Sequence, residues 1–144
     1  TNFSLYRYAE VLLIYAEGLN EYDPGNPQIA WAANQVRGRA GLPGVDQLTG
    51  NQVSMREKIR EERRHEFVAE HKRYFDILRW KTAEKVLNEP GYGINKDEKA
   101  PIGDYSVEQF LGQNRTFDAS KHYLWPIPQS ARDKNPNLGQ NPNW

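Results

Sequence analysis

The apolar pattern in the first forty residues limits the fold of this chain more than any other feature. Residues 5–22 carry apolar and small side chains at helical spacing, and one face collects Leu5, Ala9, Leu12, Leu13, Ala16, Leu19 and Asn20. Asp-Pro-Gly at 23–25 ends this pattern, and a second helix is predicted over 27–40, with Asn26 as its cap and Pro27 at its first position. Alanines on both segments predict a closely packed, tetratricopeptide-like helical hairpin.

Two more helices are predicted in the middle of the chain. Ser54 can cap a helix over 54–71, because Glu57 three residues later completes a capping box. A further helix is predicted over 74–87. The expected fold class is therefore all-α, with tetratricopeptide-like helical hairpins and long irregular loops in a single helical domain over residues 1–144.

Residues 89–120 show no sustained pattern. Within this irregular region we expect only a short helical stretch around 107–111. The little β-structure expected is a short pairing between residues 116–117 and 123–124, since residues that precede proline avoid the helical region.

The C-terminal tail is rich in Pro and Asn, and it is expected to be extended. Its two Asn-Pro-Asn triplets, at 135–137 and 141–143, predict successive turns. Such a segment becomes ordered only by burying side chains, so Trp125 is expected to be buried and the tail to fold back over the helices as a stabilising clasp.

The overall composition argues against several kinds of partner. Nineteen basic residues balance nineteen acidic ones, so no net field favours nucleic acid or an anionic membrane. The chain contains no cysteine, which excludes disulfides and thiolate metal sites. Aromatic residues make up 12% of the chain, which indicates a globular domain rather than a disordered segment.

The stretch from residue 60 to residue 80 is dense in charge, but its helical pattern is that of a scaffold. Arg63 falls on the apolar stripe that joins Ile59 to Phe67. An unpaired buried charge is costly, so Arg63 is expected to be buried and paired with an acidic residue. The nearest candidates are Glu66, Glu70 and Asp76.

Catalytic and metal-binding interpretations of the same stretch are weaker. A zinc-binding H-E-x-x-H motif beginning at His65 would need a second histidine at 69, which is Ala69. Glu62 and His65 match one half of a di-iron element, but no second copy follows. Every arginine here has an acid within four residues, which disfavours nucleic-acid binding. The sequence therefore predicts no enzyme, no metal and no cofactor.

Four blocks of sequence, in order, carry a family resemblance. They are RYAEVLLIYAEGLNE at 7–21, NQVRGRAGLP at 34–43, REKIREERRHEFVAEHKRYFDILRW at 56–80, and YLWPIPQ with NPNLGQNPNW within 123–144. Together they resemble the C-terminal part of the SusD/RagB family. One departure is Glu70-His71, where that family commonly has Glu-Gly, and it bears on the turn that follows the third helix.

The resemblance implies a non-enzymatic, α-helical protein at the bacterial cell surface. Members of the family are outer-membrane lipoproteins of the Bacteroidetes that capture oligosaccharides, or in some cases peptides, for import through a SusC-like TonB-dependent transporter. Contact with the membrane is then expected only through a lipid anchor outside this segment. No ligand contacts of the family map onto this sequence by motif.

Two functional classes remain open at this point. The chain can belong to a nutrient-binding component, or it can be a purely structural docking module that holds a partner protein. Exposed aromatic residues would favour the first, because sugar rings stack on Tyr and Trp. The candidate ligand-binding residues are Tyr92 and Tyr105, and the alternative is that both rings pack on the domain.

Overall fold

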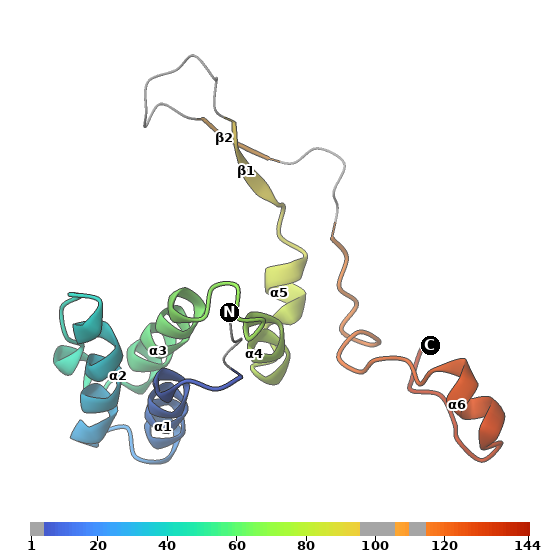
Figure 1. Ribbon diagram of the computed structural model, residues 1–144, viewed down its shortest axis with the longest axis horizontal. Coiled ribbons are helices and arrows are strands. Elements are labelled where there is room, and N and C mark those ends of the chain that lie inside the picture. Colours follow the sequence, from blue (N-terminus) through green and yellow to red (C-terminus); the bar gives the residue numbers. More distant parts are fainter. Residues whose placement is uncertain (1–4, 96–105, 110–114) are drawn as a thin grey trace. The chain divides into compact units, whose positions relative to one another are not determined.

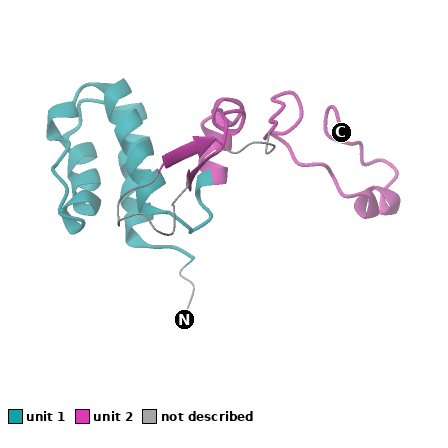
Figure 2. Cartoon of the chain, turned by 90° about the horizontal axis from the view of Figure 1, so that it is seen from above, with its two compact units in different colours: residues 1–73 teal, residues 74–144 magenta. Residues whose placement is uncertain are grey.

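The computed structural model describes residues 5–95, 106–109 and 115–144 (Figure 1). In this part of the chain six α-helices are accompanied by one short two-stranded sheet, which confirms the predicted helical fold class. The chain divides into two units, residues 1–73 and 74–144 (Figure 2). That residues 1–144 form one domain stays a prediction.

The first unit contains the predicted helical hairpin, but its first helix begins at Tyr8 rather than at residue 5, so Leu5 is exposed instead of lying on the inward face. Helix α1 (Tyr8–Tyr22) packs along α2 (Pro27–Arg39) and also against α3 (Gln52–Glu66), with the short 3-10 helix η1 (Asp46–Leu48) between α2 and α3. The cap at the start of α2 is the predicted one, since the Asn26 side chain accepts a hydrogen bond from the Gln28 amide at 3.0 Å.

Helix α3 begins earlier than predicted. Its cap is Asn51, whose Oδ1 accepts from the Ser54 amide at 3.1 Å, so the predicted cap at Ser54 is wrong. Asn and Ser are both favourable N-cap residues. Asn51 is the cap because it has the non-helical backbone conformation that this position requires, whereas Ser54 already lies inside the helix.

The core of the first unit is formed by the inward faces of its helices. The buried apolar side chains come from all three helices and from the loop before η1; they are Leu12, Leu13, Ala16, Ile29, Ala30, Ala32, Ala33, Val36, Val45, Met55, Ile59 and Phe67. Asn20 is also fully buried, and it exchanges side-chain–backbone hydrogen bonds with Gln52, each at 3.0 Å. This exchange ties the end of α1 to the start of α3.

The turn after α3 replaces the last turn of the helix predicted over 54–71. The helix ends at Glu66, and Ala69 and His71 have φ angles of 62° and 59°. His71 therefore adopts left-handed backbone at the position where the resemblance favours glycine, so the turn is kept although the residue differs.

Replacing His71 with Gly should raise the free energy of unfolding by up to about 1 kcal/mol, because glycine adopts left-handed backbone without the Cβ penalty. Urea denaturation of the two proteins measures the change. Val68, in the same turn, is exposed and is not among the residues with positive φ, so Val68→Gly should instead destabilise. If both substitutions destabilised equally, the left-handed turn would not exist in solution.

In the second unit the helix predicted over 74–87 is broken into two. Helix α4 (Arg73–Arg79) and helix α5 (Ala83–Leu87) are separated at Lys81, which has a φ of 54°. The break lets Ile77 and Ala83 share a small core with Phe117; Leu78, Val86, Leu87 and Tyr123 pack around it.

The only sheet in the described residues lies in the region predicted to be irregular. Strand β1 (Tyr92–Asn95) pairs antiparallel with β2 (Ser106–Gln109). The short helix predicted at 107–111 is therefore wrong where it can be compared, since Val107 lies in β2, and residues 110–111 fall outside the described residues. Apolar residues at every second position, as at Tyr92 and Ile94 in β1, are the pattern of a strand rather than of a helical turn.

The predicted pairing of 116–117 with 123–124 is also wrong. The backbone of Phe117 bonds instead to the Asn88 side chain, which accepts from the Phe117 amide at 2.6 Å and donates to its carbonyl at 3.0 Å. The Phe117 and Tyr123 rings meet edge-on at 4.9 Å between centroids. An amide side chain thus replaces the neighbouring strand as the partner of this backbone.

The tail folds back, but onto the segment just before it. Gln140 exchanges two hydrogen bonds with the backbone of Ile127, and the Trp144 indole donates to the carbonyl of Leu124 at 2.9 Å. Helix α6 (Gln129–Lys134) lies in the sequence between Ile127 and Gln140, and it was not predicted. Trp125 is 66% exposed, so its predicted burial is wrong: its indole N–H donates to the Tyr74 hydroxyl at 3.1 Å instead of entering a core.

Candidate functional site

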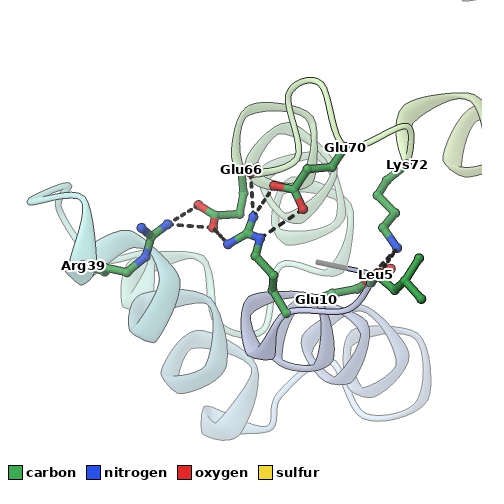
Figure 3. Close-up of polar contacts among 7 residues, drawn as sticks. Leu5, Glu10, Arg39, Glu66, Glu70 and Lys72 are labelled. Carbon is green, nitrogen blue, oxygen red and sulfur yellow. Dashed lines mark hydrogen bonds and ion pairs between the residues drawn. The ribbon is translucent and has the colours of Figure 1, made fainter. Parts of the chain in front are cut away.

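The charged stretch forms an ion-pair cluster with the segment that leads into α1 (Figure 3). The Arg7 guanidinium donates to both carboxylate oxygens of Glu70, at 2.6 and 3.0 Å, and to Glu66 Oε1 at 2.7 Å. It also donates to the Glu66 backbone carbonyl at 2.9 Å, which is left open at the end of α3. Arg7 therefore closes the helix end and neutralises two carboxylates at once.

Arg39, at the end of α2, completes this cluster. Its guanidinium donates to both oxygens of Glu66, at 2.6 and 2.7 Å, so Glu66 is shared by two arginines (Figure 3). Hydrogen bonds to Glu70 and then to Glu66 raise the pKa of Arg7 above its already high ordinary value. These contacts hold the carboxylates as fixed counter-ions, which is a structural arrangement.

A second pair is buried between α2 and α3. Arg37 Nη1 lies 2.5 Å from Glu62 Oε2, and the two side chains are only 9% and 7% exposed. The Nε of Arg37 donates to the Pro43 carbonyl at 2.8 Å. Glu62, which matched half of a di-iron element in the sequence, is thus engaged by an arginine.

Arg63 is buried, as predicted, and only 3% of its surface is exposed. Its guanidinium lies over the ring of Phe67, 5.1 Å from the centroid, and Phe67 is itself part of the core. Its pairing with Glu66, Glu70 or Asp76 stays a prediction. Asp76 forms an ion pair with Arg79 at 2.9 Å within α4.

Two ion pairs at the surface of the first unit lower carboxylate pKa values. The hydrogen bond from Arg56 lowers the pKa of Glu21, and the hydrogen bond from Lys58 lowers that of Glu61. A depressed carboxylate pKa adds stability above the ordinary value of 4.5, and this stability is lost as the pH falls below it. Since both carboxylates are about half exposed, these pairs are minor contributors.

The second unit has its own perturbed groups. Burial, followed by a hydrogen bond to Glu84, raises the pKa of the Tyr123 hydroxyl. Hydrogen bonds from Ser120 lower the pKa of the Asp118 carboxyl, which stabilises a turn at the surface. Both arrangements order the loop next to Phe117.

Within the described ranges, no group of three or more His, Asp or Glu side chains is placed to hold a metal ion. Glu62 and His65, the residues that matched metal-binding motifs, have separate environments. Glu62 pairs with Arg37, and His65 is exposed on the last turn of α3. In the same part of the chain, no helix combines the length and apolarity needed to cross a bilayer.

The ligand-binding candidate Tyr92 opens strand β1, and its side chain is 61% exposed. In an antiparallel pair, directly opposite residues share a face; Ile94 is opposite Val107, and Tyr92 is opposite Gln109. Tyr92, Ile94 and Val107 therefore form one exposed apolar face on the hairpin, with Gln109 at its end.

The second candidate, Tyr105, lies outside the described residues. Ile94 and Val107 were not predicted as neighbours of Tyr92, because this region was predicted to be irregular. The alternation of apolar and other residues around Tyr92, Ile94 and Val107 was the sequence pattern that could have indicated two strands. Strands of only four residues are too short for this pattern to be distinguished from chance.

Comparison with known proteins places the chain in a family. The model of the SusD family matches residues 1–144. The chain is 35% identical to SusD-like protein P2 of Formosa agariphila over 98% of its own length and 25% of that protein. It is also 35% identical to SusD-like protein P38 of the same organism, over 67% of its own length and 20% of that protein. The chain thus spans between a fifth and a quarter of the length of these relatives.

Solved structures agree with this placement. The protein BT4246 superposes with a TM-score of 0.81 at 26% identity, over 99% of this chain and 24% of that one. A SusD homologue from Bacteroides thetaiotaomicron superposes with a TM-score of 0.64 at 30% identity, over 96% of this chain and 26% of that one. The residues of this chain, its helical fold and its relatives all agree: it belongs to the SusD family.

Proposed function

We propose that this chain is part of a non-enzymatic, cell-surface nutrient-binding protein that helps to capture oligosaccharides for import through a SusC-like TonB-dependent transporter. The observation that carries the proposal is the match to the SusD family over residues 1–144, together with 35% identity to a SusD-like relative. In this proposal the protein sits at the outer membrane and is attached by a lipid anchor outside this segment.

The ion-pair clusters support a scaffolding role for the first unit. Arg7, Arg37 and Arg39 hold Glu62, Glu66 and Glu70 as fixed counter-ions between helices. A carboxylate held between guanidinium groups is poorly placed to transfer protons to a substrate. The residues proposed for ligand contact are instead Tyr92 and Tyr105.

The full-length protein offers a direct test of the proposed function. Isothermal titration calorimetry against a panel of oligosaccharides should give binding for at least one, and chromatography of the mixtures should show the sugars unchanged. If no oligosaccharide bound at millimolar concentration while the protein co-purified with a SusC-like transporter, the docking-module alternative would replace this proposal.

Replacing Tyr92 with Ala should weaken the binding of that oligosaccharide about two- to twelvefold, because stacking on one aromatic ring contributes roughly 0.5–1.5 kcal/mol. Tyr92→Phe keeps the ring and should retain affinity within about twofold if stacking is the main contact. Kd values from calorimetry make the comparison. Unchanged affinity in Tyr92→Ala would remove Tyr92 from the ligand site and leave the proposed function standing.

A further inference from the structure

Helix α1 is apolar on two sides, and the first unit covers only one of them. The inward side holds Leu12, Leu13, Ala16 and Asn20, which are buried against α2 and α3. The outward side also carries large apolar residues at helical steps of three, four and seven, namely Tyr8, Val11, Tyr15 and Tyr22, with Ile14 beside them. Here these five residues are called the outer stripe of α1.

The outer stripe is more apolar than a solvent-facing helix surface should be. Its members are between 46% and 88% exposed. A surface helix of a globular protein ordinarily carries polar residues opposite its buried face. The acidic side chains of α1 lie to one side of the outer stripe: Glu10 is buried, and Glu17 and Glu21 are the acidic residues that reach the surface there. A contiguous apolar surface of this kind marks a site of contact.

Gly18 provides an independent observation at the centre of this stripe. It lies three residues after Tyr15 and four before Tyr22, inside a continuous helix, where glycine is unfavourable compared with alanine. A Cβ added to Gly18 would meet nothing within 4 Å, and the residue does not have positive φ. Nothing in the described part of the chain therefore requires a glycine here, whereas a second backbone that approaches α1 closely would require one.

We propose that the outer stripe of α1 is covered by a helix from the part of a longer SusD polypeptide that lies outside residues 1–144. The chain spans 25% of its relative P2 and 24% of BT4246, so about three quarters of those polypeptides lie elsewhere and can supply a covering element. A stripe that runs the length of α1, with a notch at Gly18, suits a second helix packed lengthwise. This interface goes beyond the proposed ligand binding and does not depend on it.

Photo-cross-linking in the full-length protein tests the proposal. A benzoylphenylalanine at position 15, replacing Tyr15, should cross-link within the same polypeptide to a peptide outside residues 1–144, identified by mass spectrometry. The same probe in place of Glu57, a 69% exposed side chain on α3, should give no such product. A cross-link to a second copy of the protein, a cross-link inside residues 1–144, or the absence of any cross-link at position 15 would overturn the proposal.

Two glycine substitutions give a second readout. Gly38, near the end of α2, also has nothing within 4 Å of an added Cβ, so Gly38→Ala should raise the Tm of the full-length protein by about 1–4 °C through helix propensity. Gly18→Ala should lower the Tm instead, and Gly18→Leu should lower it further, because the side chain meets the covering helix. Equal increases for Gly18→Ala and Gly38→Ala would overturn the proposal.

Discussion

Replacing Arg37 with Ala should lower the free energy of unfolding by about 3–5 kcal/mol, because the substitution leaves the Glu62 carboxylate buried without its counter-charge. The two side chains are less than one tenth exposed and lie 2.5 Å apart. The same arginine donates to the Pro43 carbonyl, so the loop after α2 loses a hydrogen bond as well. Guanidinium denaturation followed by circular dichroism measures the loss.

Arg39 is a matched control for Arg37, because it lies two residues away on the same helix and also pairs with a glutamate of α3. Its side chain is 63% exposed, and its partner Glu66 keeps Arg7. Arg39→Ala should therefore cost less than about 1 kcal/mol. The double replacement Arg37→Met with Glu62→Leu should recover most of the loss, since an apolar pair needs no counter-charge. Equal effects of the two single Ala substitutions would place Arg37 in solvent.

Replacing Arg63 with Ala should destabilise the protein by about 3 kcal/mol, the second largest effect that we expect. The side chain is 3% exposed and its guanidinium covers the ring of Phe67. Removing it leaves a cavity in the core of the first unit and takes a cation away from the aromatic face. Denaturant unfolding gives the value, and the neighbouring Arg64→Ala is the control, because Arg64 is exposed and should change stability by less than about 0.5 kcal/mol.

A third variant separates packing from charge at this position. Arg63→Met keeps most of the side-chain volume and removes the positive charge. If packing against Phe67 supplies most of the stability, Met should recover more than half of the loss seen with Ala. If a carboxylate depends on Arg63, as the sequence predicts, Met should be about as damaging as Ala, because the buried acid stays uncompensated. A loss below about 0.5 kcal/mol for Arg63→Ala would contradict its burial.

Prediction from sequence succeeded where short-range interactions decide the structure. The helices α1 and α2, the cap at Asn26 and the burial of Ile59, Arg63 and Phe67 follow from spacing within a few residues. It failed where two local solutions were close in energy. Asn51 replaced Ser54 as a cap, and the helix predicted over 74–87 broke at Lys81.

The tail shows a different kind of failure. The sequence predicted that the tail folds back over the helices, whereas its hydrogen bonds in the structure are with residues 120–127. The expected burial of Trp125 assumed that large aromatic residues enter a core. In the structure the tail is held instead by hydrogen bonds between side-chain amides and backbone groups, such as those between the Gln140 side chain and the Ile127 backbone. Hydrogen bonds of this kind leave no periodic trace in a sequence, so α6 and the exposed Trp125 could not be anticipated.

The sequence by itself determined that this chain is helical, that a helical hairpin forms within residues 5–40, and that four blocks resemble the SusD/RagB family. Helix periodicity and capping act between residues at most four positions apart, so one sequence contains them in full. Only the tertiary structure decided that Arg7 pairs with Glu66 and Glu70, and Arg37 with Glu62. These partners are between 25 and 63 residues apart, and the choice among many nearby acids depends on distances that exist only once the helices have packed.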